Sequence, residues 1–203
     1  MKAIKSKQFI YTTPNVFDDE EAIFFKMKRI HPKLFGLFCP VQYKLVSKEK
    51  VCVPYEFMVF HYTLRKSAKP KDATKKGFFD KEGEVALVYD LNEMHPFHFD
   101  LFDHLDLKKK AVDSLEGRMM KANCSGKQAL DDSVECIKWQ YLRKVFHHGI
   151  PDIALLKRER FYREAWRLTL ISHGKTFEKF AYKDNFGAEN EHIAGLKVRL
   201  TTT

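Results

Sequence analysis

Histidine and carboxylate side chains cluster in the segment 92–104, and these are groups that bind divalent metal ions. The candidate ligands are His95, His98, Asp100 and His104. Neutral imidazole together with carboxylate suits zinc and other metals of intermediate softness. Pro96 disfavours the helical conformation at His95, so His95 and His98 need not share a face. The favoured interpretation is a strand-to-helix connection with solvent-exposed histidines, in which Asp100 caps the helix. A metal-binding protein centred on this segment is an alternative.

The chain lacks the sequence patterns of the common nucleophilic and phosphate-binding sites. It contains no GxSxG, no HExxH and no glycine-rich loop of the Walker or dinucleotide-binding type. Its nine glycines are scattered singly, so no run of backbone amides is available to cradle a phosphate group. We therefore expect a protein that is not an enzyme and that carries no cofactor.

Basic residues give the chain a strong excess of positive charge. Lys and Arg number 36 against 27 Asp and Glu, which gives a formal net charge of +9. Such a chain attracts polyanions, so nucleic acid or an acidic protein is the expected class of partner. The alternative explanation of the same charge is that the lysines only make the surface soluble.

Two basic clusters are the best candidates for contact with an anion. The candidates are Arg65, Lys66, Lys69 and Lys71 in a polar loop, and Arg160, Arg163, Arg167 and Trp166 in a predicted strand. Guanidinium groups form paired hydrogen bonds with phosphate, and aromatic rings stack on unpaired bases. The second cluster therefore suits single-stranded nucleic acid, and its rigid strand should position the arginines better than a loop positions lysines. A third basic run, Lys108-Lys109-Lys110, adds to the charge.

Alternation along a strand limits how the second cluster can act. It places Arg163 and Arg167 on one face and Trp166 on the other. The preferred interpretation is one wet face and one buried face, with Trp166 in the core. If the arginines bind a polyanion, replacing Arg163 and Arg167 by alanine should weaken binding without unfolding the protein.

The hydrophobic pattern predicts the elements that carry these residues. Helices are predicted over 18–30, over most of 100–121 and over 128–148, and strands over 42–46, 51–64, 84–90, 161–172 and 176–182. Acidic residues in the first turn of the helix at 18–30 suit its dipole, and Pro32 ends it. Pro54 is expected at a strand start, a bulge or a sheet edge, because proline cannot donate a hydrogen bond to a ladder.

Together these elements predict an α+β fold. It would contain two units, each a helix plus a β-hairpin and related by duplication, packed as a mainly antiparallel sheet with helices on one face. The expected boundaries are an N-terminal helix/β-hairpin unit at 1–100, a helical, charged connector at 101–127, and a long helix plus C-terminal β-hairpin unit at 128–203. One continuous domain is the alternative.

Composition also bears on the compartment. The chain has no run of about 18 apolar residues that could span a membrane. Its basic N-terminus is not followed by the apolar stretch of a secretory signal. The four cysteines, Cys39, Cys52, Cys124 and Cys136, form no CxxC pair and fit a reducing compartment. We expect a soluble, cytoplasmic protein with no membrane span.

The sequence thus predicts a non-enzymatic basic binding protein that contacts an anionic partner such as nucleic acid. The main alternative is a protein-interaction or scaffold module that uses exposed sheet edges to bind an extended segment of its partner.

Overall fold

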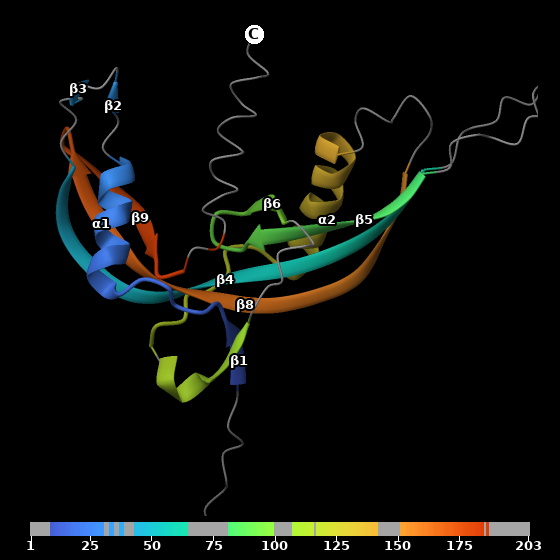
Figure 1. The fold of residues 1–203 in the computed structure, drawn as a ribbon, viewed down its shortest axis with the longest axis horizontal. Helices are drawn as coiled ribbons and strands as arrows, with labels where there is room; N and C mark the ends of the chain where they lie inside the picture. The colour runs from blue at the N-terminus through green and yellow to red at the C-terminus, as the bar shows by residue number, and fades with distance from the viewer. Residues whose placement is uncertain are drawn as a thin grey trace, which may run out of the picture. The chain divides into compact units, whose positions relative to one another are not determined.

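Strands dominate the structure of this protein (Figure 1). The computed structural model describes residues 9–30, 33–34, 37–38, 43–64, 81–99, 107–115, 117–141, 151–184 and 186. Its helices are α1 (Asp19–Ile30) and α2 (Gly126–Cys136), with a 3₁₀ turn at Val112–Leu115 and a π-helical turn at Ile137–Tyr141. Its strands are β1 (Phe9–Thr12), β2 (Lys33–Leu34), β3 (Leu37–Phe38), β4 (Lys44–Leu64), β5 (Lys81–Asp90), β6 (His95–Phe99), β7 (Lys108–Ala111), β8 (Pro151–Ser172) and β9 (Lys175–Tyr182).

Within the described residues, seven of these strands form one mixed sheet. Hydrogen bonding connects them in the order β6-β5-β4-β8-β1-β7, and β9 also pairs with β8. Strand β1 runs parallel to β8, whereas the pairs β1–β7, β4–β5, β5–β6 and β8–β9 are antiparallel. The two longest strands, β4 with 21 residues and β8 with 22, are neighbours in this order.

The predicted arrangement of two helix-plus-hairpin units is wrong. The chain does contain α-helices and strands, and the β4–β5 and β8–β9 pairs exist. Their long strands β4 and β8 are neighbours in one mixed sheet, however, so neither hairpin forms a separate unit with the helix that precedes it. Hydrophobic patterns report which residues are buried, but the pairing of distant strands depends on contacts that a local pattern does not contain.

The helix predicted over most of 100–121 is also wrong where the structure describes it. Residues Lys108–Ala111 form β7, which pairs with β1, and only a single 3₁₀ turn follows at Val112–Leu115. Lysine and alanine favour helices in isolation, but pairing with β1 overrides this weak preference. The helix predicted over 128–148 is confirmed as far as Tyr141, the last of its residues that the structure describes.

Contacts divide the chain into two compact units, each assembled from distant segments. Unit 1 takes its residues from 1–54, 105–121 and 161–191, and unit 2 takes its residues from 55–104, 122–160 and 192–203. Strands β4 and β8 contribute residues to both units. The division into consecutive segments that the sequence suggested stays a prediction.

Unit 1 contains α1 and its packing partners. Asp18 Oδ1 accepts hydrogen bonds from the backbone N–H groups of Glu20 and Glu21, both at 2.8 Å, and Glu21 Oε2 accepts one from the Asp18 N–H at 3.1 Å. This reciprocal capping box explains why the predicted helix begins here. The apolar side of α1 then packs on a buried cluster of the sheet. That contact is made by Ile23, Met27 and Ile30 against Leu168, Leu170 and Ala181.

Unit 2 is built around the face that β4 and β5 present to α2. Met58, Phe60, Leu87 and Tyr89 are completely buried in this core. Ser125 caps α2 by accepting a hydrogen bond from the Gln128 N–H at 3.1 Å. Tyr89 donates a hydrogen bond from its hydroxyl to Asp132 at 2.6 Å, which ties α2 to the sheet. Burial and this carboxylate raise the pKa of Tyr89.

Pro54 lies inside β4, directly before Tyr55, the first residue that pairs with β5. Its missing N–H group therefore precedes that ladder.

Neither α1 nor α2, the α-helices of the described residues, has the length and apolar character needed to cross a lipid bilayer.

The described cysteines are free thiols, and two of them are buried. Burial raises the pKa of the Cys52 and Cys136 thiols from 9.0 to about 11. Between these values the unfolded chain releases protons that the folded protein retains. The thiols therefore stabilise the folded state fully below about pH 9, and this contribution is lost as the pH rises toward 11.

We expect the free energy of unfolding to fall as the pH rises from about 9 to about 11. Urea denaturation at several pH values across this range measures the slope. A Cys52→Ala, Cys136→Ala variant provides the control, because its stability should fall less steeply over the same range. Parallel slopes for the two proteins would contradict the raised pKa values.

Candidate functional site

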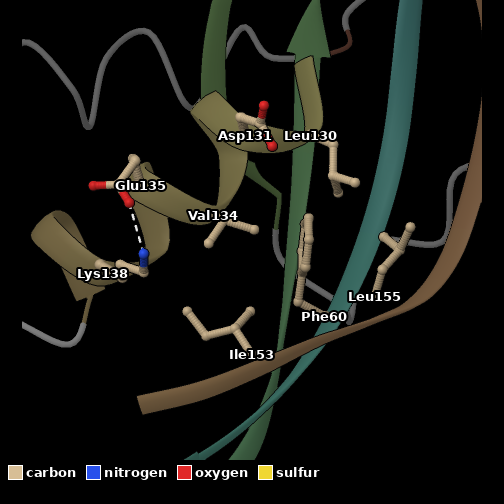
Figure 2. A pocket seen from close by; sticks show the side chains of 8 residues that line it. All are labelled: Phe60, Leu130, Asp131, Val134, Glu135, Lys138, Ile153 and Leu155. Atoms are coloured by element: carbon tan, nitrogen blue, oxygen red, sulfur yellow. Dashed lines mark hydrogen bonds and ion pairs between the residues drawn. The ribbon is translucent and has the colours of Figure 1, made fainter. Parts of the chain in front are cut away.

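A groove of about 350 Å³ lies in unit 2 between α2 and the strands it covers (Figure 2). Its apolar lining comes from Leu130 and Val134 of α2, Phe60 of β4, and Ile153 and Leu155 of β8. Figure 2 shows these side chains converging from the helix and from the strands. Such a volume lies at the low end of ligand-binding pockets.

Charged side chains of α2 and the π-helical turn form one rim of the groove. Lys138 Nζ lies 2.6 Å from Glu135 Oε1, and Trp139 donates a hydrogen bond from Nε1 to Glu135 Oε2 at 3.1 Å. These two contacts lower the pKa of Glu135. Asp131, one turn earlier on the same helix face, has no ion-pair partner among the described residues. The rim therefore carries two carboxylates and one ammonium group.

The side chains of β8 change faces next to this groove. Leu155 lines the groove with Phe60 of β4. Lys157 instead lies 5.5 Å from the ring centre of Phe57, which points to the opposite side of β4 from Phe60. Residues two apart on a regular strand share a face, so the side chains of β8 change face between Leu155 and Lys157. The change turns residue 158 toward the face on which Phe60 lies.

Two arginines of β8 bind a buried carboxylate of β4. Glu56 is only 2% exposed. Its Oε2 accepts hydrogen bonds from Arg158 Nε at 2.8 Å and Nη2 at 2.5 Å, and its Oε1 accepts one from Arg160 Nη2 at 2.6 Å. Arg158 Nη2 also donates to the Gly126 carbonyl at 2.8 Å, and a side chain at Gly126 would collide with that guanidinium group. Arg160, a predicted anion ligand, is therefore already bound to a carboxylate, although its side chain is 47% exposed.

Strands β1 and β7 present a second surface, in unit 1. Phe9 and Tyr11 lie two residues apart on β1, and they are 51% and 40% exposed. Tyr11 pairs with Lys109 of β7, and Phe9 pairs with Ala111, so these side chains share one face. Lys109 Nζ lies 4.8 Å from the ring centre of Phe9. We call this surface, made of β1 and β7, the aromatic ribbon.

The three lysines of β7 differ in their surroundings. Lys108 and Lys109 are exposed. Lys108 and Lys110 point to the face opposite Lys109 and the rings, and Lys110 forms an ion pair there with Glu164. Two of the three ammonium groups on β7 thus remain accessible to a polyanion.

Trp166 is partly buried, but β8 does not divide into one wet and one buried face here, because Arg163 and Ala165 on the opposite face are only 6% and 3% exposed. Trp166 packs against the buried cluster of Leu168 and Leu170. The ammonium groups of Lys48 and Lys50 lie 5.2 Å and 5.0 Å from the centre of its ring system. Its Nε1 is buried and has no hydrogen-bond partner among the described residues. Trp166 is thus largely a core residue, covered by lysines.

Some of the charge around Trp166 is already neutralised. Lys50 Nζ lies 2.6 Å from Asp19 Oδ2, and Lys183 Nζ lies 2.8 Å from Asp19 Oδ1. The two ammonium groups hold the pKa of Asp19 well below its usual range. Arg167 forms an ion pair with Glu49 at a partly exposed position.

Arg163 is a structural residue of unit 1. It is 6% exposed, and it donates hydrogen bonds from Nε and Nη2 to Asp184, the shortest at 2.7 Å. Its guanidinium group stacks on Tyr182, 3.7 Å from the ring centre, and Nη2 also donates to the Phe186 carbonyl at 2.7 Å. Thr13 completes the cluster by donating to Asp184. Arg163 therefore holds together chain segments that are far apart in sequence.

The remaining predicted ligands do not form a described site. Arg65, Lys66, Lys69, Lys71, Asp100 and His104 lie outside the described residues. His95 is exposed at the start of β6, and the backbone of His98 pairs with Leu87. Over the ranges the structure describes, no group of three or more His, Cys, Asp or Glu side chains could hold a metal ion. The metal-site hypothesis stays a prediction.

Two surfaces were missed at the level of sequence. Phe9 and Tyr11 are two residues apart in a short run of strand-forming residues, which was a usable signal. The groove had no such signal, because Phe60, Val134 and Ile153 come together only in the folded chain.

Comparisons with known protein families, with curated proteins and with solved structures find no match to this chain.

Replacing Arg163 should destabilise the protein strongly. Arg163→Ala leaves Asp184 buried without its counter-charge, and the expected loss is about 3–5 kcal/mol in the free energy of unfolding. Arg167→Ala is the matched control: its ion pair is partly exposed, and the expected loss is below about 1 kcal/mol. Chemical denaturation of both variants measures the difference, and equal losses would contradict a structural role for Arg163. A variant with both Arg163 and Arg167 replaced by alanine would lose stability, so weaker polyanion binding by that variant would not show that these arginines contact the anion.

Proposed function

We propose that this protein binds single-stranded nucleic acid and that the aromatic ribbon of unit 1 is the contact surface. The observation that carries this proposal is the pair of exposed rings, Phe9 and Tyr11, on one face with the exposed ammonium group of Lys109. Aromatic rings exposed on a strand can stack on unpaired bases, while lysines neutralise the phosphates between them.

The spacing of the two rings supports stacking on successive bases. Residues two apart on a strand are separated by roughly 6.8 Å. Bases in a single strand are free to unstack and spread, so each ring can receive one base. Stacking of this kind tolerates any base, because every base has a π face. We therefore expect binding that depends little on sequence.

The charge of unit 1 supports the same proposal. Among its described residues, Lys and Arg outnumber Asp and Glu, whereas the opposite holds in unit 2. Lys109 is accessible on the face of the ribbon that carries the two rings, Lys108 is accessible on the opposite face, and the chain as a whole carries +9. Each phosphate that a lysine neutralises releases counterions, so the affinity should fall steeply with salt.

Lysines on the last strand of a sheet have another use, which is to prevent association with other sheet edges. Strand β7 is the last in the hydrogen-bonding order, so its lysines fit that role as well. That role does not require exposed rings beside the lysines. The two explanations therefore differ in what the loss of Tyr11 should do.

Fluorescence anisotropy of labelled single-stranded RNA, single-stranded DNA and duplex DNA, each at two salt concentrations, tests the proposal. We expect both single strands to bind more tightly than the duplex and all binding to weaken at the higher salt concentration. Tight binding to the duplex alone, or none at low salt, would contradict the proposal. Binding of a protein partner that survives high salt would instead favour strand addition at a sheet edge.

Variants of the ribbon locate the contact. Tyr11→Ala should weaken binding to the single strand by about 1–3 kcal/mol through lost stacking. Lys109→Ala should reduce the salt dependence by about one counterion. Lys28→Ala is the matched control, because Lys28 also lies above an exposed ring, 6.0 Å from the centre of Phe24, but on α1. Equal effects of Lys28→Ala and Lys109→Ala would remove the ribbon from the proposal.

A further inference from the structure

The groove of unit 2 combines exposed apolar side chains with an unbalanced charge. Leu155, which lines it, is 40% exposed, and Trp139 beside its rim is 63% exposed. A concave surface lined by apolar side chains is a place where apolar groups of a bound molecule can be buried. The nucleic-acid proposal for unit 1 makes no use of these exposed side chains.

One of the two carboxylates on the rim, that of Asp131, forms no ion pair that would stabilise the helix among the described residues. Asp131 and Glu135 are four residues apart on α2, so they face the same way and repel each other. Lys138 neutralises Glu135, which leaves the negative charge of Asp131 without a partner among the described side chains. A cationic group on a bound molecule would balance this charge.

We propose that this groove binds an amphipathic helix of a partner protein, with leucine-like side chains in the groove and a lysine or arginine beside Asp131. The apolar lining positions on α2, Leu130 and Val134, are themselves one helical turn apart, so they offer a repeat that a second helix can match. The volume of about 350 Å³ suits a few side chains of such a helix. Charge complementarity selects a basic helix over an acidic one.

Three labelled peptides test the proposal by fluorescence anisotropy on the full chain. The first is an amphipathic helix of leucine and lysine with leucines at the i, i+3, i+4, i+7 spacing. The second has glutamate in place of each lysine, and the third has serine in place of each leucine. We expect the first peptide to bind at least about tenfold more tightly than either of the others. Tighter binding of the glutamate peptide would overturn the proposal.

Matched variants place the peptide in the groove. Leu155→Ser should weaken binding of the leucine–lysine peptide by about tenfold, whereas Leu156→Ser should not, because Leu156 is the next, also exposed, residue of β8 and does not line the groove. Asp131→Asn should reduce the preference for lysine over glutamate peptides, and the exposed Glu93→Gln should leave it unchanged. Thermal unfolding of each variant checks that the fold is intact.

Two results would overturn the assignment. One is binding of the leucine–lysine peptide that is equally strong in Leu155→Ser and in the unaltered chain. The other is self-association of the chain alone, measured by sedimentation, that Leu155→Ser abolishes and Leu156→Ser does not. That second result would assign the groove to another copy of this chain.

Discussion

Two buried carboxylates are neutralised by arginines of β8, one carboxylate in each unit. Glu56 binds Arg158 and Arg160 in unit 2, and Asp184 binds Arg163 in unit 1. A carboxylate without its counter-charge in such a place would cost several kcal/mol, so these pairs constrain the rest of the structure. They determine which way β8 presents its side chains, and they secure the chain around Thr13 and Phe186 in unit 1.

These internal pairs reduce the share of the chain's positive charge that is available to an anionic partner. Arginines have the ideal geometry for phosphate, but the same forked geometry suits a buried carboxylate. Arg158, Arg160 and Arg163 all bind carboxylates within the chain, and Arg167 pairs with Glu49. On the aromatic ribbon, the accessible charge beside the exposed rings comes from Lys109. Our proposal of nucleic-acid binding therefore uses the ribbon rather than the arginines of β8.

The two units differ in chemistry. The aromatic ribbon in unit 1 combines flat rings with ammonium groups, which suits a flexible polyanion. The groove in unit 2 combines an apolar lining with carboxylates, which suits an apolar segment with a positive charge. The change of face along β8 matters for the groove, because it lets Leu155 line the groove while Arg158 reaches Glu56 on the same face of the sheet. A strand that alternated regularly could not meet both requirements at these positions.

The sequence by itself determined those features that depend on neighbouring residues. The start of α1 follows from Asp18 and Glu21 at capping-box spacing. Only the tertiary structure decided that Lys108–Ala111 is a strand, that Arg163 lies against Asp184, and that Phe60, Val134 and Ile153 line one groove. Each of these joins residues far apart in the chain. The local sequence pattern indicates the secondary structure and the burial that a residue favours. The partner that it contacts from a distant part of the chain depends on which contacts the whole chain can satisfy at once.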